Sequence, residues 1–117
     1  GASMIAVIFE FTPAPGQTNE YFALGAAMKA EVENFDGFIS IERFESVTSP
    51  GKFVSLSFWR DEAAVQAWRN VQAHRAAQAR GRASVFSDYR LRVASVMRDY
   101  GKTSRDEAPA DSRKAHG

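Results

Sequence analysis

The fold of this chain is decided by residues 57–78, SFWRDEAAVQAWRNVQAHRAAQ, and by residues 89–93, YRLRV. A strand rich in aromatic residues leads into an alanine-rich helix that carries one tryptophan, Trp68, and one histidine, His74. A second strand follows this helix. The arrangement predicts a small α+β protein with one pocket between a sheet and its helices.

The helix in this stretch has a well-marked start and a less regular second half. Asp61 is a typical N-cap, because its carboxylate can accept hydrogen bonds from the free N–H groups of the first turn. The buried face is predicted to hold Ala64, Val65 and Trp68. We expect a break near residues 70–72 and then a further turn or two over residues 73–80, closed by Gly81.

Hydrophobic periodicity predicts the other elements. Apolar residues alternate over 4–11, as in a strand, and recur at steps of three and four over 18–34, as in an amphipathic helix. The expected elements are, in chain order, a strand at 4–11, a helix at 18–34, strands at 38–47 and 53–60, the helix after Asp61, and a strand at 85–97. This order, β-α-β-β-α-β, is the split or ferredoxin-like α+β pattern with a four-stranded antiparallel sheet.

Local signals predict finer geometry in these elements. Asp36-Gly37 is expected to end the first helix, with the glycine as a left-handed cap. The apolar parity of the strand at 38–47 changes between Ile41 and Phe44, which predicts a bulge or a switch in the buried face. Alternation in the last strand places Tyr89 on the inner face.

Size and composition indicate a single domain. The chain has 117 residues, of which 44% are hydrophobic and 25% charged. We expect residues 1–3 to be the remnant of an expression tag and residues 4–100 to form the domain. Residues 101–117 are almost without apolar side chains, so we expect a flexible C-terminal tail unless a partner chain holds it.

Charge and cysteine content limit the classes of partner. The formal net charge of +1 gives no general attraction to nucleic acid or to a membrane surface. No apolar run approaches the length of a membrane span. The chain has no cysteine, which fits the reducing cytoplasm, where we expect the protein to be located.

The predicted sheet has one face without a cover. Two helices on the same side of four antiparallel strands leave the opposite side open. The chain supplies more aromatic area than one helix-covered face requires, in Phe11, Phe44, Phe53, Phe58 and Phe86. An exposed apolar sheet favours association, so we expect a homodimer in which two such sheets pack together.

Motifs for most enzyme classes are absent. The only histidines are His74 and His116, and they form neither an HExxH pair nor a two-histidine-one-carboxylate set, so we expect no metal site. No nucleophile elbow, Walker loop or dinucleotide-binding fingerprint occurs. These absences leave the pocket between sheet and helices as the expected site.

The pocket has few candidate residues. Six residues of continuous helix place Trp68 and His74 about 120° apart, whereas a break would bring both toward one cavity. Trp68 is either a core residue or a wall on which a ligand stacks. His74 is either a helix-end residue or an acid, base or ligand contact, and Tyr89 either packs or hydrogen-bonds a phenolic ligand. We predict His74 and Tyr89 as catalytic residues and, for substrate binding, Phe9, Phe22, Trp68 and Gln78.

The residues that resemble a known family run through most of the chain. They are Phe35-Asp36-Gly37-Phe38, Phe58-Trp59-Arg60-Asp61, Ala63-Ala64, Trp68, His74, Ala77-Gln78, Gly81-Arg82, Tyr89 and Val93 to Tyr100. Over about residues 4–100 the sequence resembles the antibiotic biosynthesis monooxygenase superfamily. The resemblance implies a dimeric α+β barrel. Some members of this family oxidise polycyclic phenols with dioxygen and no cofactor, and others degrade haem.

The haem-degrading branch implied by this resemblance uses three side chains. They are an asparagine on the first strand, a tryptophan on the second helix and a histidine ten residues later. Trp68 matches the tryptophan, but Gln78 stands in place of the histidine and Phe9 near the asparagine position. Because an amide is a poor axial ligand for iron, bound haem is disfavoured and we expect no cofactor.

The cofactor-free branch implied by the resemblance requires less of the protein. A deprotonated, electron-rich phenol passes an electron to dioxygen, so the protein must bind the rings and favour the anion. Trp68 would be the stacking wall, His74 or Tyr89 would take the phenolic proton, and Gln78 or a nearby arginine would stabilise the anion. We therefore expect a cofactor-independent monooxygenase of a small aromatic or quinol-like substrate. The alternatives are a non-catalytic small-molecule binding module and a haem-binding or haem-degrading protein.

Overall fold

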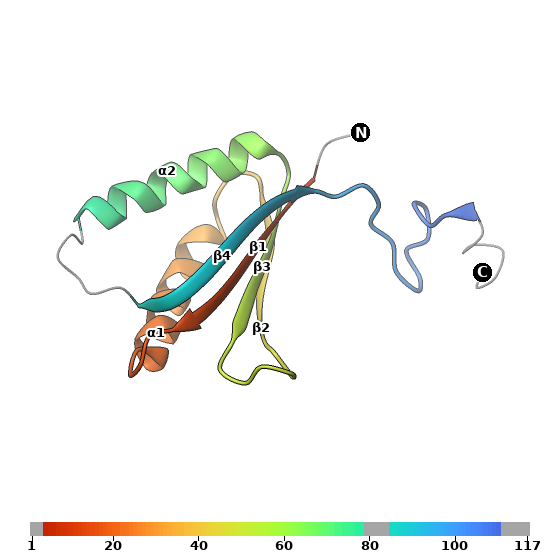
Figure 1. Cartoon of the computed structure of the whole chain (residues 1–117). Coiled ribbons are helices and arrows are strands. Elements are labelled where there is room, and N and C mark those ends of the chain that lie inside the picture. Colours follow the sequence, from red (N-terminus) through yellow and green to blue (C-terminus); the bar gives the residue numbers. More distant parts are fainter. Residues whose placement is uncertain (1–3, 79–84, 111–117) are drawn as a thin grey trace.

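The computed structural model describes residues 4–78 and 85–110, with residues 73–78 as backbone only. The elements are β1 (Ile5–Pro13), α1 (Thr18–Val32), β2 (Phe38–Glu45), β3 (Phe53–Trp59), α2 (Glu62–Gln78) and β4 (Phe86–Ser95). The strands form one antiparallel sheet in the order β2-β3-β1-β4, and both helices lie on the same side of it (Figure 1). This architecture confirms the predicted α+β ferredoxin-like fold.

The strand register divides the sheet into two faces. In β1, Val7 lies opposite Ser57 of β3 and Val93 of β4, so these three residues share a face. We call the side that carries Ile5, Val7, Phe9 and Phe11 of β1 the helix-covered face. The opposite side, which carries Ala6, Ile8 and Glu10, is the open face. Alternation along each strand assigns every other strand residue to one of these faces.

The core lies between the helices and one end of the helix-covered face. It consists of Ile5, Val32, Trp59, Ala64 and Trp68. The start of α2 is fixed by Asp61, whose Oδ1 accepts a hydrogen bond from the backbone N–H of Ala64 at 2.9 Å. The predicted N-cap is therefore confirmed, and it fixes the residue at which α2 begins next to the sheet.

Both helices differ from the predicted ones, α2 in its continuity and α1 in the residue at which it ends. The expected break at residues 70–72 is wrong, because α2 continues through them to Gln78. Asparagine, valine and glutamine lower helix propensity only slightly, and neither proline nor glycine interrupts the segment. In α1 the helix ends at Val32, so Gly37 is not its cap. Gly37 still has a φ of 88°, in the turn that leads into β2.

The irregularity of β2 also differs from the prediction. The register shifts between Phe38 and Ser40, not between Ile41 and Phe44. Beyond this shift the strand is regular, with Arg43 on the helix-covered face opposite Ser55, and Phe44 on the open face. The change in apolar parity therefore arises because an arginine occupies an inward position.

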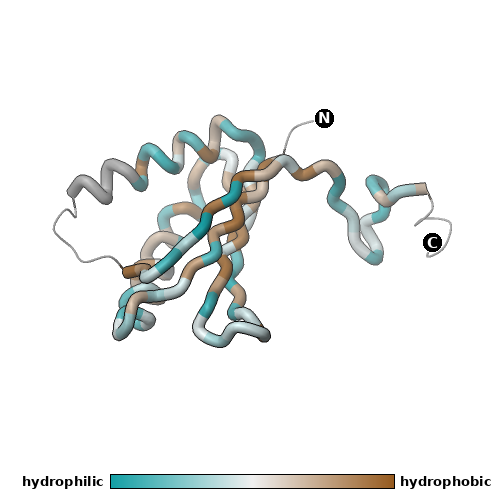
Figure 2. Tube along the Cα trace, viewed as in Figure 1, coloured by the Kyte–Doolittle hydropathy of each residue, from teal (hydrophilic) through white to brown (hydrophobic). Residues whose placement is uncertain are grey.

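The aromatic residues that predicted an open apolar sheet divide between the two faces. Phe11, Phe53 and Phe86 pack together on the helix-covered side, and only Phe44 and Phe58 lie on the open face. Aliphatic side chains supply the rest of the apolar centre of the open face, in Ala6, Ile8, Val54 and Leu56. No helix or strand of the described residues covers this centre (Figure 1). Figure 2 shows the hydrophobic colouring concentrated in the strands.

The chain leaves the domain after β4. Val96 N–H donates a backbone hydrogen bond to Met4 O at 2.9 Å, and residues 96–110, here called the C-terminal arm, project beyond the sheet and away from both helices (Figure 1). The arm has local order, for example the hydrogen bonds from Asp99 N–H to Glu107 Oε1 (2.7 Å) and from Arg105 Nη1 to Gly101 O (3.1 Å). Within the described residues, no helix is both long and apolar enough to cross a membrane.

Candidate functional site

Aromatic side chains on the helix-covered side form two clusters. The first cluster, at the end near α1, is made of Phe9, Phe11, Tyr21, Phe22, Phe53, Phe86 and Tyr89. The second cluster, beneath the first turns of α2, is made of Phe35, Phe38, Trp59 and Trp68. The first cluster is held by stacked, tilted and edge ring contacts and the second by edge and tilted contacts, of the kind that stabilise protein cores.

The predicted site residues are divided between these clusters. Phe9 and Tyr89 lie together in the first cluster, with ring centroids 5.7 Å apart. Phe22 lies at its edge, against Tyr21 and Phe53 at 5.6 Å each. Trp68 belongs to the second cluster. The prediction of Tyr89 on the inner face is confirmed by its register opposite Phe11.

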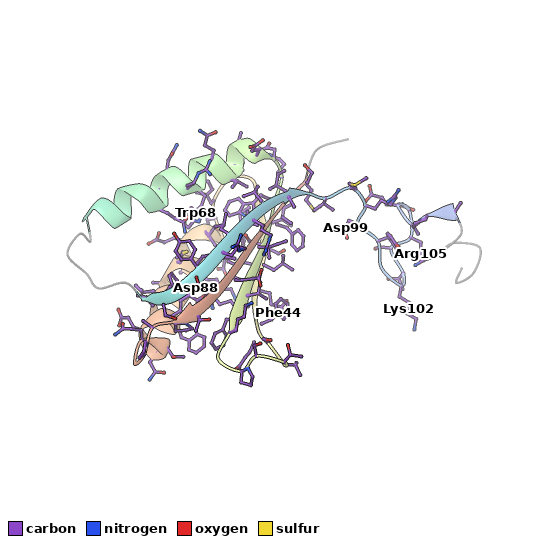
Figure 3. The ribbon with its side chains drawn as sticks, in the orientation of Figure 1. Phe44, Trp68, Asp88, Asp99, Lys102 and Arg105 are labelled. Atoms are coloured by element: carbon purple, nitrogen blue, oxygen red, sulfur yellow. The ribbon has the colours of Figure 1, made fainter. Side chains whose placement is uncertain are left out.

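Trp68 is part of the protein's own core. Its side chain is 8% exposed, and its ring lies 5.1 Å from that of Phe35 and 6.3 Å from that of Trp59. Figure 3 shows it beneath α2, on the opposite side of the sheet from Phe44. The neighbouring Trp59 Nε1–H donates to Ser57 Oγ at 2.9 Å, which satisfies a buried indole. A role for Trp68 as a ligand wall stays a prediction.

His74 and Gln78 lie on the last turns of α2, six and ten residues after Trp68. Their side chains are outside the described part of the structure. The predicted roles of both residues therefore stay predictions.

The most distinctive feature of this face is an exposed apolar strip on β4. Tyr89, Leu91 and Val93 all face the helix-covered side, yet they are 64%, 52% and 44% exposed. The adjacent strand β1, by contrast, carries buried residues on the same face, such as Ile5 and Phe11. Apolar area left in water beside a core favours the binding of an apolar ligand. We call these three residues the β4 strip.

Arg43 is a site residue that sequence reasoning did not single out. Its guanidinium carbon lies 5.7 Å from the centre of the Tyr21 ring, on the helix-covered side. Burial raises the pKa of the Tyr21 hydroxyl, and the charge of Arg43 partly opposes that shift. Gly25 of α1 makes room for the arginine, since a Cβ at position 25 would lie 2.6 Å from Arg43 Nη2. In the sequence, the change in apolar parity along β2 was the signal that could have pointed to the inward position of Arg43.

The open face carries a charged group beside its apolar centre. Glu10 pairs with Lys52 (Nζ to Oε1, 3.2 Å) and with Arg92. Hydrogen bonds from Lys52 and Arg92 lower the pKa of Glu10. These residues line a shallow cavity of about 190 Å³ together with Thr12, Asp88, Arg90 and others. Trp68 lines neither this cavity nor a second one, of about 220 Å³, beside Arg43.

Ligands for a metal or for haem are poorly represented. Among the described residues, no three His, Asp or Glu side chains are grouped closely enough to hold a metal ion. For haem, Gln78 stands where the resemblance implies an imidazole, and an amide is a poor axial ligand for iron. The residues present therefore do not fit an axially ligated haem at this position.

Comparisons with known proteins agree with this fold. The family described as antibiotic biosynthesis monooxygenase matches residues 4–80. The jasmonate monooxygenase ABM of Pyricularia oryzae is 45% identical over 93 residues, which cover 80% of this chain and 43% of that protein. The chain thus spans less than half the length of this relative.

Two solved structures from Mycobacterium tuberculosis are similar to this chain. Rv0793 has a TM-score of 0.70 at 23% identity, covering 85% of this chain and all of the other, which shows the shared fold. The haem degrader MhuD, solved with two haems in its active site, has a TM-score of 0.64 at 28% identity. That similarity covers 83% of this chain and 99% of MhuD.

Proposed function

The chain belongs to the antibiotic biosynthesis monooxygenase family, and we propose that it is a cofactor-independent monooxygenase that acts on a small aromatic or quinol-like substrate. The observation that carries this proposal is the β4 strip, which leaves apolar area open on the face where the helices and the core also lie. A planar apolar ring would gain hydrophobic contact there, next to the partly buried ring of Phe9.

The proposed chemistry balances without an added reductant. A quinol-type substrate supplies two electrons and two protons, one oxygen atom of dioxygen enters the product, and the other leaves as water. The protein would bind the ring, limit water around it and favour the ionised phenol. Tyr89 and His74 are the proposed groups for the phenolic proton, and Gln78 or an arginine is proposed to stabilise the anion.

The named relative indicates a second substrate class. The printed name of the Pyricularia protein describes a monooxygenase of jasmonate, which is a small-ring carboxylic acid. A compound of this size and partly apolar character also suits an apolar strip flanked by aromatic rings. Small-ring acids are therefore included among the ligands to be tested for binding.

Two alternatives are separated from the leading proposal by simple measurements. A non-catalytic binding module would bind the same compounds on the same strip without consuming oxygen. A haem protein, as MhuD is, would give a sharp Soret shift with hemin that the His74→Ala substitution abolishes. We propose that hemin gives no such shift and that no cofactor is needed, because the ligand set does not fit.

A homodimer that packs the open faces together is part of the proposal. It is supported by the apolar centre of that face, which no described element covers. Nucleic acid and membrane surfaces are not proposed as partners, given the net charge of +1. A cytoplasmic location, which fits the lack of cysteine, is proposed as well.

Oxygen uptake tests the proposed activity directly. Anthrone and other quinol-type compounds should be oxidised by the wild-type protein, with one oxygen atom from labelled dioxygen found in the product. Leu91→Ser should raise KM several-fold, because it removes apolar contact from the strip. The control is Val47→Ser, an exposed valine that is not in the strip. Tight binding with no oxygen uptake would contradict the enzyme and favour the binding module.

A further inference from the structure

Arg43 is a partly buried cation on β2. It lies on the helix-covered face, and among the described residues no carboxylate is within ion-pair distance of its guanidinium. Its contact is with the ring of Tyr21. A charged group that is withdrawn from water without a partner is unfavourable for folding. Such a position is typical of a binding residue whose partner arrives with a ligand.

The surroundings of Arg43 are shaped to keep it accessible. Arg43 lines the cavity of about 220 Å³ together with Lys29, Ile41 and Glu42. Lys29 follows Gly25 by four residues, so both lie on the same side of α1. Glu42 belongs to the open face by its register, and it is the one carboxylate in the lining. Lys29 is paired with Glu33 Oε1 at 4.0 Å, so among the described residues Arg43 is the cation of this lining that has no carboxylate partner.

The strand register aligns Arg43 with the β4 strip. The strand register places Arg43, Ser55, Phe9 and Leu91 in one row across the helix-covered face. Three strand spacings separate the ends of this row, which is about 14 Å. Ser55 has a small side chain, while Phe9 and Leu91 are apolar. The row thus offers a cation at one end and an apolar surface at the other.

We propose that Arg43 binds the carboxylate of an amphiphilic small molecule whose apolar ring lies over Phe9 and Leu91. This inference rests on the proposed function, because it uses the same face, and it adds small-ring carboxylic acids as a class of ligand that this face binds. A guanidinium matches a carboxylate with two parallel N–H···O hydrogen bonds, which a neutral ester of the same acid cannot replace in full.

The test compares one acid with its neutral ester. Binding of jasmonate and of methyl jasmonate to the full chain is measured by titration calorimetry. We expect the wild-type protein to prefer the acid by at least about tenfold. Arg43→Met should abolish this preference and leave the affinity for the ester unchanged. Arg69→Met, which removes an exposed arginine on α2, is the matched control and should keep the preference.

Gly25→Ala moves the arginine without removing it. The new Cβ would lie 2.6 Å from Arg43 Nη2, so the end of this flexible side chain must shift. The melting temperature should not fall, because alanine favours a helix interior over glycine. We expect this variant to lose most of the preference for the acid. It tests the proposal even if Arg43→Met folds poorly.

Several results would overturn the assignment. One is that the wild-type protein binds acid and ester with equal affinity, and another is that it binds neither compound. A third is that Arg43→Met lowers the affinity for acid and ester equally. A fourth is that Gly25→Ala keeps the full preference for the acid. Oxygen uptake with anthrone is measured in parallel. If uptake persists when the acid preference is absent, the role of Arg43 fails and the proposed function stands; if both are absent, both fail.

Discussion

Arg60 shows how a single residue joins two segments of this fold. Its guanidinium forms two hydrogen bonds with Asp36, which precedes β2, at 3.1 and 3.2 Å. Its Nε–H donates to Asp61 Oδ2 at 3.0 Å, at the start of α2. The hydrogen bonds from Arg60 lower the pKa of Asp36. The pKa of Asp61 is lowered first by the backbone N–H of Ala64 and then by Arg60.

These pKa shifts predict the pH dependence of the Arg60→Gln variant. A carboxyl group whose pKa is lower in the folded state stabilises the fold above its unfolded pKa, near 4, and loses that effect as the pH falls through the folded value. We expect the urea midpoint of Arg60→Gln to lie below that of the wild type at pH 7 and the two to converge toward pH 3. The effect is modest because the groups are exposed. An unchanged gap at pH 3, or an equal loss in Arg69→Gln, would contradict it.

The residues of the candidate site differ in how far sequence could predict them. Tyr89 was placed correctly because alternation along a regular strand fixes its face. Arg43 was missed because a charged side chain is normally assigned to solvent, and its inward position depends on space at Gly25 and on the ring of Tyr21. That space exists only once α1 has packed on β2, so no local pattern contains it.

The junction between α1 and β2 depends on close approach to α2. Gly37 has a φ of 88°, and a Cβ there would lie 2.4 Å from Ala64 Cβ. Gly37→Ala should therefore lower the free energy of unfolding by at least about 2 kcal/mol, from backbone strain and from the clash. Gly16 is a matched control, since its φ is 76° and nothing lies within 4 Å of an added Cβ. Gly16→Ala should cost about 1 kcal/mol. Equal losses in urea unfolding would show that the approach to Ala64 is unimportant.

Helix α2 is attached to the sheet mainly through its first turns. Trp68 packs there against Phe35 and Trp59, and it is buried. Trp68→Ala should lower the free energy of unfolding by about 3–5 kcal/mol, as for other large core residues. Trp68→Phe should restore much of this loss. If Trp68→Ala instead left stability unchanged and weakened ligand binding alone, Trp68 would be a ligand wall and not a core residue.

At the level of elements, the sequence predicted which strands and helices exist, and their order, better than it predicted whether a helix is continuous. Every strand and helix was expected near its observed position, because periodicity and turn residues act locally. The predicted break at residues 70–72 was wrong, because α2 continues through these residues. Nothing in that segment opposes a helix, and helix propensity decided the outcome.

The open face determines how whole molecules should associate. Leu56 lies in its apolar centre, opposite Ile8 of β1. A glutamate at this position would place two like charges in a symmetric interface without water. We expect Leu56→Glu to shift the protein from dimer to monomer in sedimentation velocity, and Phe44→Glu to have a similar but smaller effect at the edge. Val47→Glu is the control and should remain dimeric. A wild-type protein that sediments as a monomer would contradict the proposed dimer.

We expect the C-terminal arm to contribute to the same proposed association. It projects beyond the sheet and away from the helices, so a partner on the open face would lie beside it (Figure 1). Figure 3 shows that the arm carries Asp99, Lys102 and Arg105, and its local hydrogen bonds give it order without support from the domain. A chain ending at Val96 keeps the bond to Met4 O and should show a dimer dissociation constant at least about tenfold higher, because contacts with the partner are lost. A chain ending at residue 110 retains the arm and should dimerise as the full chain does. Equal dissociation constants for the two truncated chains would mean that the arm takes no part in the dimer.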